Sequence, residues 1–274
     1  MSSSHRHTAL VALVTLMTSA ASLGAQTAPA DTSIPDRQLF HRSDLYVAGA
    51  FAVATVALLP ADHHLAELAR DDDLVNSGTL KRLSTDVRFF GGPGPFIIGG
   101  TMYAVGRLGH LPRMAEIALH GTEAVVAGSV VAGVIKVVAG RERPYALNAD
   151  PHDFNFGGGR RSDTTKSFPS GHATAAFSAA AAVVSETHDW WPQSTWYVAP
   201  LMYGGATAVG LSRMYDNQHW ASDVVMGAAI GTFAGLKVVR FNHTHTGNKL
   251  DKWFLGTRIV PTGNGTALAW NAEF

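Results

Sequence analysis

Residues 168–185 read FPSGHATAAFSAAAAVVS, a proline and a Ser-Gly pair followed by a long apolar run. The run exceeds the usual length of a strand and does not alternate apolar with polar residues, which predicts a helix that begins near Gly171. The first backbone N–H groups of such a helix are unpaired and lie at its positive dipole end, so they form an anion cradle. Gly171 allows close approach to the backbone, Ser170 can cap the helix or contact the anion, and His172 can move a proton. Ordinary helix capping explains the same residues equally well.

Five further apolar segments accompany this one, at residues 45–60, 89–106, 114–139, 196–212 and 220–239. Proline residues fall at or near the ends of several of them, where helices tolerate proline. We therefore predict an all-α fold, a helical bundle of about six core helices, with a polar insertion at about residues 145–168. The best charge-free run, Phe89–Gly106, has 18 residues. A bilayer span needs about 20, which favours a soluble or membrane-attached bundle over six spanning helices without excluding the latter.

The composition of the 274-residue chain excludes several classes of protein. It has 21 basic and 21 acidic residues, so it lacks the positive charge of a general nucleic-acid binder. It has no cysteine, which excludes disulfides, thiolate zinc sites and iron–sulfur clusters.

The N-terminal residues predict export. Residues 1–25 place Arg6 before an apolar run and a series of small residues that ends at Ala25, the pattern of a secretory signal peptide. A short uncleaved membrane anchor is the alternative. Residues 26–44 are expected to form a polar tether. Export would place the protein in the periplasm or cell envelope, where it could also associate with a membrane.

The bundle domain is predicted at residues 45–240, with a C-terminal extension at 241–274. In the extension, the period-two pattern of Thr266–Phe274 follows a Gly-Asn-Gly turn. This pattern predicts a small β-hairpin with Thr257–Val260.

Two cations lie near the end of the segment at residues 114–139. Lys136 and Arg143 are seven residues apart, so a helix would return them to nearly the same face. Cations at the end of an apolar helix are costly unless an anion meets them. Taken alone, the pair is better explained as two side chains at a helix end that extend their charged groups toward water.

A third cluster contains Ser212-Arg213, His219 and Asp223. His219 and Asp223 are one helical turn apart, so the carboxylate can accept one ring N–H and leave the other ring nitrogen free as a nucleophile. An isolated His/Asp pair at this spacing is more often structural.

Together, the three clusters supply three cations, a helix-N-terminal cradle and two histidines. This inventory fits phosphoryl transfer through a phosphohistidine, with the cations and amides holding the phosphoryl oxygens. No set of carboxylates demands Mg²⁺, and no metal site is expected. Asp71-Asp72-Asp73 is interpreted as a solvated loop, and His63-His64 and His243/His245 lack the partners of a convincing metal site.

These residues resemble the type 2 phosphatidic acid phosphatase superfamily, which also includes bacterial class A acid phosphatases and vanadium haloperoxidases. Its signature is Lys-x6-Arg-Pro, Pro-Ser-Gly-His and Ser-Arg-x5-His-x3-Asp. Every specified position matches, as Lys136, Arg143-Pro144, Pro169-Ser170-Gly171-His172, Ser212-Arg213, His219 and Asp223. The resemblance covers about residues 45–240 and implies the helical bundle of that superfamily.

The resemblance implies a role for each matching residue. His219 would be the nucleophile, Asp223 its orienting partner, and His172 the general acid and then the base. The phosphate would be bound by Lys136, Arg143, Ser170, Gly171 and Arg213. No cofactor is implied, although vanadate would fit the same cradle as a phosphate mimic.

The sequence favours an exported, metal-independent phosphatase that acts on phosphomonoesters or diphosphates. A lipid phosphate is the preferred substrate because of the apolar helices and the tether, and a soluble monoester is the alternative. Two other functions stay open. One is a vanadium-dependent haloperoxidase, and the other is a non-catalytic envelope protein that binds phosphate headgroups.

Overall fold

The structure is a computed structural model, and it describes residues 38–245, 248–262 and 265–270. Within these residues the six predicted segments form six long helices, which confirms the all-α expectation. They are α2 (Arg42–Leu58), α6 (Gly94–Leu108), α7 (Pro112–Ala139), α8 (Gly171–Trp190), α9 (Thr195–Tyr215) and α10 (Ala221–Thr244).

Shorter elements were not predicted, apart from the start of the segment at residues 89–106, which forms a 3₁₀ turn before α6. They are α3 (Asp62–Ala69), α4 (Asp72–Val75), α5 (Gly78–Arg88), α11 (Lys249–Phe254) and the 3₁₀ turns η1 (Leu59–Ala61), η2 (Phe89–Gly91), η3 (Gly158–Arg160), η4 (Asp163–Thr165) and η5 (Pro192–Ser194). Helix α5 begins after Ser77, whose hydroxyl accepts from the Leu80 N–H at 3.4 Å. Such short helices depend on capping and tertiary contacts more than on hydrophobic periodicity.

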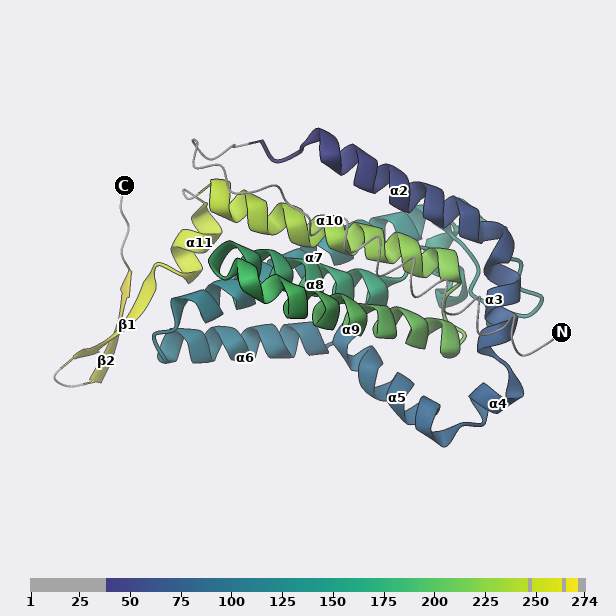
Figure 1. Cartoon of the computed structure of the whole chain (residues 1–274), viewed down its shortest axis with the longest axis horizontal. Coiled ribbons are helices and arrows are strands. Elements are labelled where there is room, and N and C mark those ends of the chain that lie inside the picture. The colour runs from purple at the N-terminus through teal and green to yellow at the C-terminus, as the bar shows by residue number, and fades with distance from the viewer. Residues whose placement is uncertain (1–37, 246–247, 263–264, 271–274) are drawn as a thin grey trace.

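Helix α8 lies at the centre of the bundle and packs against α7, α9 and α10 (Figure 1). The closest approach is to α10, where Gly227, Gly231 and Gly235 recur at one-turn intervals. A Cβ atom at Gly227 would lie 2.5 Å from the Ser170 carbonyl oxygen, and one at Gly235 would lie 2.7 Å from the Ser178 carbonyl oxygen. The two backbones are therefore close enough that only glycine fits between them.

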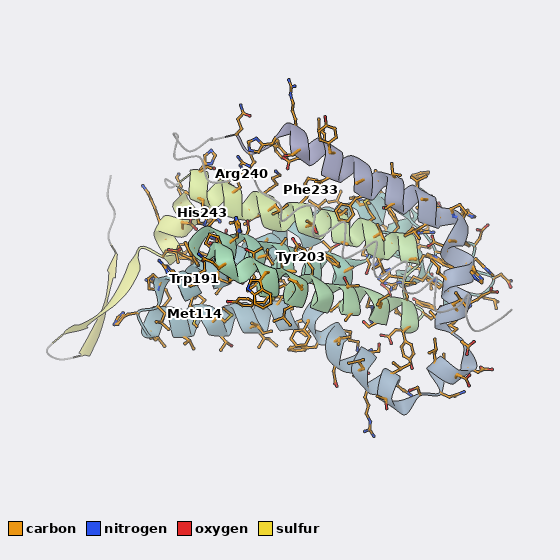
Figure 2. All side chains as sticks on the ribbon, viewed as in Figure 1. Met114, Trp191, Tyr203, Phe233, Arg240 and His243 are labelled. Atoms are coloured by element: carbon orange, nitrogen blue, oxygen red, sulfur yellow. The ribbon has the colours of Figure 1, made fainter. Side chains whose placement is uncertain are left out.

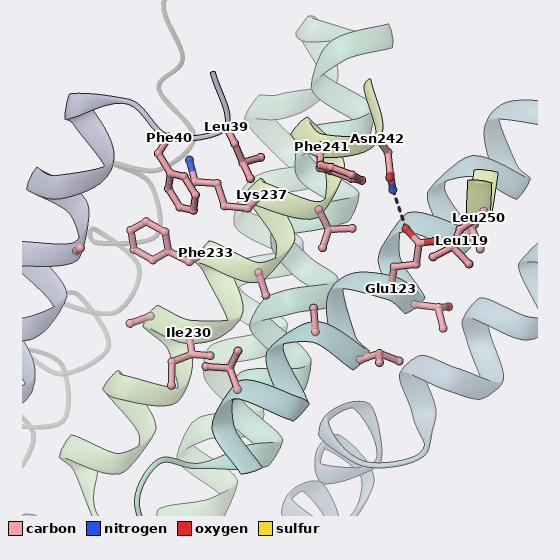
Figure 3. A pocket seen from close by; sticks show the side chains of 18 of the residues that line it. Leu39, Phe40, Leu119, Glu123, Ile230, Phe233, Lys237, Phe241, Asn242 and Leu250 are labelled. Carbon is pink, nitrogen blue, oxygen red and sulfur yellow. Dashed lines mark hydrogen bonds between the residues drawn. The ribbon is translucent and has the colours of Figure 1, made fainter. Parts of the chain in front are cut away.

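Helix α2 runs along the outer side of α10 (Figure 1). Between α2, α7 and α10 lies an apolar groove of about 980 Å³, whose lining includes Phe51, Val126, Ile230 and Phe233. Figure 3 shows its polar end, where the Asn242 amide donates to Glu123 Oε2 at 2.7 Å.

Three stretches are long and apolar enough to cross a membrane by length and composition, namely Arg42–Ala69, Pro112–Ala139 and Ala221–Thr244. Helix α7 leaves Val126, Val130, Val134 and Val138 exposed. Exposed apolar faces of this length support association of the bundle with a membrane.

Two helices cross the predicted domain boundaries. Helix α2 begins at Arg42, inside the predicted tether, and α10 continues to Thr244, past the predicted boundary at 240. The predicted signal peptide and the first part of the tether lie outside the described residues.

The C-terminal extension returns to the bundle through α11. The Tyr103 hydroxyl donates to the Phe254 carbonyl at 2.6 Å. Beyond α11, β1 (Thr257–Thr262) and β2 (Gly265–Trp270) pair antiparallel, with Thr257 opposite Trp270. The predicted hairpin falls on these strands, and residues 263–264 and 271–274 lie outside the described residues.

Candidate active site

The three predicted clusters come together at one end of the bundle. Lys136 lies in the last turn of α7, Ser170 directly precedes α8, and Asp223 lies in the first turn of α10. The Ser170 N–H donates to the Asp223 carbonyl at 2.9 Å, which joins the starts of α8 and α10. A Cβ at Gly171 would lie 3.5 Å from Lys136 Cε, so Lys136 extends over the start of α8.

The start of α8 has the geometry of the predicted cradle. Ser170 is fully buried, and its hydroxyl accepts from the Ala173 N–H at 3.4 Å, as an N-cap does. Helix geometry leaves the N–H groups of Gly171 and His172 without intrahelical acceptors, and the dipole adds positive potential there. The structure thus supplies two amides beside the Lys136 ammonium.

Lys136 and Arg143 are positioned mainly by carbonyl groups. Lys136 Nζ donates to the Lys166 carbonyl at 2.8 Å, and Arg143 Nε donates to the Asp163 carbonyl at 2.9 Å. Arg143 Nη1 also donates to Gln218 Oε1 at 2.9 Å. These acceptors are neutral, and Arg143 Nη2 also lies 3.5 Å from the exposed Asp163 carboxylate, so Lys136 and the partly paired Arg143 offer positive charge to an anionic ligand.

Arg213, in the last turn of α9, is held from a different side. Its Nη1 donates to Asp216 Oδ2 at 2.8 Å, while Asp216 Oδ1 accepts from the Ser84 hydroxyl at 2.7 Å. Arg88 Nη1 lies 3.8 Å from Asp216 Oδ2. Arg213 Nε is buried and has no hydrogen-bond partner among the described residues, so it is a donor that a bound oxyanion could satisfy. Sequence analysis did not identify Ser84 or Arg88, because α5 carried no signal of its own.

His219 lies in the turn between α9 and α10 and is 3 % exposed. Burial lowers its pKa to about 3, with Asp223 opposing the shift and Lys136 adding to it. The ring is therefore neutral at physiological pH and keeps a lone pair. Its Nδ1 lies 3.7 Å from Asp223 Oδ2, which is longer than a hydrogen bond. The two residues are adjacent, as predicted, but the expected hydrogen bond is not formed at this distance.

Asp223 is held by other donors. Its Oδ2 accepts from the Ser167 hydroxyl at 2.5 Å and from the Trp220 N–H at 2.8 Å. Its Oδ1 accepts from Arg141 Nη1 at 2.6 Å. These bonds fix the carboxylate beside the His219 ring.

Arg141 and Asp62 form a support that sequence analysis missed. Both side chains are fully buried, and Arg141 Nη2 donates to Asp62 Oδ2 at 2.7 Å. Asp62 Oδ1 also accepts from the Ser222 N–H at 2.9 Å. Arg141 therefore bridges the carboxylates of Asp62 and Asp223. The available signal was a third cation between Lys136 and Arg143, but nothing in the sequence paired it with Asp62.

His172 lies in the first turn of α8, beneath η2. Burial and the nearby guanidinium of Arg213, together with Lys136 and Arg143, lower its pKa to about 4. A Cβ at Gly92 would lie 3.5 Å from His172 Nε2, so the chain after η2 closes one side of the ring.

A second apolar groove, of about 320 Å³, lies between α6, α7, α8 and α9. Its lining includes Phe90, Ala176, Gly205 and Val209. Ala176 is one turn from His172 on α8. The groove therefore lies close to the His172 side of the cluster.

Comparisons with known proteins relate the chain to phosphatases. A family model described as the PAP2 superfamily matches residues 118–246. A lipid A 1-phosphatase from Porphyromonas gingivalis is 40 % identical over 91 residues, which are 32 % of this chain and 19 % of that protein. The chain thus spans about a fifth of the length of that relative.

The fold is shared with a solved structure described as a transmembrane PAP2 type phosphatidylglycerolphosphate phosphatase from Bacillus subtilis. The TM-score is 0.54 at 20 % sequence identity, over 74 % of this chain and 96 % of that one. At this identity the likeness shows a common fold.

Proposed function

The chain belongs to the PAP2 superfamily, and on that premise we propose that it is a metal-independent lipid phosphatase that acts through a phosphohistidine at His219. The observation that carries the proposal is the neutral, buried His219 ring beside a fixed carboxylate, next to a cradle of Lys136, Arg143 and Arg213. A neutral imidazole is a nucleophile, and the cations stabilise negative charge on the phosphoryl oxygens.

In the first step, a His219 ring nitrogen attacks phosphorus and the bond from phosphorus to the leaving oxygen breaks. His172 gives its proton to that oxygen. In the second step, neutral His172 takes a proton from water, the resulting hydroxide attacks phosphorus, and the phosphorus–nitrogen bond breaks. Phosphate leaves, and both histidines return to their starting states.

His172 must hold a proton for the first step, although its pKa is about 4 without ligand. A bound phosphate places negative charge among the same cations that lower this pKa. Binding therefore raises the pKa of His172, and the substrate monoanion can bring the proton with it. The general acid thus forms when a phosphorylated ligand is present.

A lipid leaving group fits the position of the smaller groove. In-line attack by His219 directs the leaving group toward the opposite, His172 side of the phosphoryl group. The apolar groove that begins at Ala176 lies on that side. The named activities of the two similar proteins, on lipid A and on phosphatidylglycerolphosphate, agree with a lipid substrate.

The test is phosphate release in EDTA from wild type and from His219→Ala, with His245→Ala as the matched control because His245 is exposed and lies outside the site. The panel is phosphatidic acid, phosphatidylglycerophosphate, a polyprenyl diphosphate, lipid A and p-nitrophenyl phosphate. We expect release by wild type and His245→Ala and at least a ~10³-fold loss in His219→Ala. No release from any substrate by folded wild type would overturn the proposal.

We also propose that the chain is exported to the cell envelope and that its signal is cleaved after Ala25. The support is the residue pattern of residues 1–25. The mass of the mature protein from a membrane fraction tests this. A chain that starts at Gln26 agrees, and an intact N-terminus contradicts the cleavage.

A further inference from the structure

A second polar cluster lies at the other end of the bundle, where α7 begins and α8 and α10 end. Figure 2 shows His243 at this end, together with Trp191 and Met114. His120 of α7 is 16 residues before Lys136, which corresponds to about 24 Å along the helix. The cluster is therefore separate from the candidate active site.

Glu186 is at the centre of this cluster and is fully buried. Its Oε1 contacts His120 Nδ1, and its Oε2 lies 3.0 Å from His243 Nε2. One ligand atom from each of the three residues lies within 4.8 Å of the other two. Three helices thus direct two imidazole nitrogens and a carboxylate to one point.

The outer nitrogen of each histidine faces a second carboxylate. His120 Nε2 lies 3.3 Å from Asp251 Oδ1, and His243 Nδ1 lies 4.0 Å from Asp189 Oδ2. An imidazolium ring has two N–H groups and can donate to carboxylates at both nitrogens, whereas a neutral ring has one N–H and leaves one nitrogen as a possible metal ligand. A cation bound by the inner nitrogens and Glu186 would take the place of the inner ring protons. The outer His120 N–H can then donate to Asp251, the arrangement usual around metal-bound histidines, while Asp189 lies near His243 beyond hydrogen-bond distance.

We propose that His120, Glu186 and His243 bind a divalent transition-metal ion of the zinc class. Two imidazoles and one carboxylate form a donor set that zinc accepts, with a fourth position left for water. The His243 side chain is 34 % exposed, so that position can be reached from solvent. Glu123 is a less suitable ligand because its Oε2 already accepts from the Asn242 amide.

The ion would join α7, α8 and α10, while Asp251 attaches α11 through the His120 ring. The site is structural, since it is remote from His219. The sequence does not reveal it, because His120 and Glu186 are 66 residues apart and Glu186 and His243 are 57 apart. The expectation that His243 lacks metal-site partners considered only its neighbours in the sequence.

The test uses the full chain in detergent, stripped with a chelator, reloaded with zinc chloride and dialysed. Metal analysis is expected to give about one zinc per chain, and zinc is expected to raise the Tm by ~5 °C. His243→Ala should lose both effects. His245→Ala, the control two residues away on an exposed position, should keep both.

A second variant separates ligand loss from misfolding. Asp251→Asn keeps the three ligands but weakens the bond to His120, so we expect about one zinc per chain with a ~10-fold weaker affinity. Zinc no higher in wild type than in His243→Ala would overturn the proposal and leave an ion-paired cluster of imidazolium and carboxylate groups. Phosphate release does not enter this test, so its result is independent of the proposed enzyme activity.

Discussion

Arg141 and Asp223 form a fully buried ion pair, with Nη1 2.6 Å from Oδ1, beside the His219 ring. The same guanidinium contacts Asp62, so one cation is shared between two carboxylates. Asp223 is therefore stabilised as a charged group from the side away from His219. This arrangement fixes the carboxylate before any ligand arrives.

Replacing Asp62 with Asn tests this support. The change removes one charge from a buried ion-pair network, so we expect a loss of about 3 kcal/mol in the free energy of unfolding. Because Asp62 acts on His219 only through Arg141 and Asp223, kcat should fall while KM stays unchanged. Thermal unfolding and steady-state kinetics measure the two effects. Asp86→Asn, at an exposed position, should change neither.

The buried histidines predict a pH-dependent stability. Burial lowers the pKa of His219 to about 3 in the folded chain, against about 6.5 when it is unfolded. Below pH 6.5 the unfolded chain therefore binds a proton that the folded chain does not, and stability falls as the pH falls from about 6.5 toward 3. The loss is about 1.4 kcal/mol per pH unit for this group.

Thermal unfolding between pH 5 and 8 measures this dependence. His219→Gln should show a shallower fall than wild type below pH 6.5, and His245→Gln should follow wild type. Equal slopes in all three proteins would show that His219 does not titrate as proposed.

The smaller groove predicts a substrate-selective variant. Gly205 lines this groove, and a Cβ there meets nothing within 4 Å, so Gly205→Leu should fill the groove without a clash. We expect KM for a lipid phosphate to rise about tenfold while p-nitrophenyl phosphate hydrolysis stays unchanged. Gly204→Leu is the matched control, since Gly204 also has free space but is outside the groove lining. A parallel loss on both substrates in Gly205→Leu would place the lipid elsewhere.

The close contact of α8 and α10 predicts opposite effects of two alanine substitutions. A Cβ at Gly231 would overlap the Thr174 carbonyl, so Gly231→Ala should destabilise the protein by about 1–3 kcal/mol. A Cβ at Gly49 of α2 would have nothing within 4 Å, so Gly49→Ala should stabilise the protein by up to about 1 kcal/mol through helix propensity. Thermal unfolding checks both predictions: the Tm of Gly231→Ala should lie below that of wild type, and the Tm of Gly49→Ala should lie above it.

The long helices were predictable because each contains an apolar run that is too long for a strand. The local motifs were predictable for a similar reason, since the cap at Ser170 and the spacing of His219 and Asp223 involve neighbours along one segment. The buried ion pair of Arg141 with Asp62, which holds Asp223 in place, was not predictable. Asp62 is 79 residues from Arg141, and no local pattern connects the two.

Whether the helices expose an apolar face to a membrane could not be predicted from the sequence for the same reason. Helix α7 carries Glu116, His120 and Glu123 in its first half, and these residues interrupt the apolar run in the sequence. In the fold, His120 is buried and Glu123 is bonded to Asn242, so they do not interrupt an exposed face. Which polar residues face inward depends on tertiary packing.

The most direct test of the central claim is capture of the phosphohistidine. Wild type turning over a lipid phosphate in EDTA would be quenched rapidly into base and examined by peptide mass spectrometry. We predict a phosphoryl group on His219 that is present during turnover and is lost once the substrate is exhausted. Phosphate release at the wild-type rate with no phosphoryl group on His219 would contradict the account.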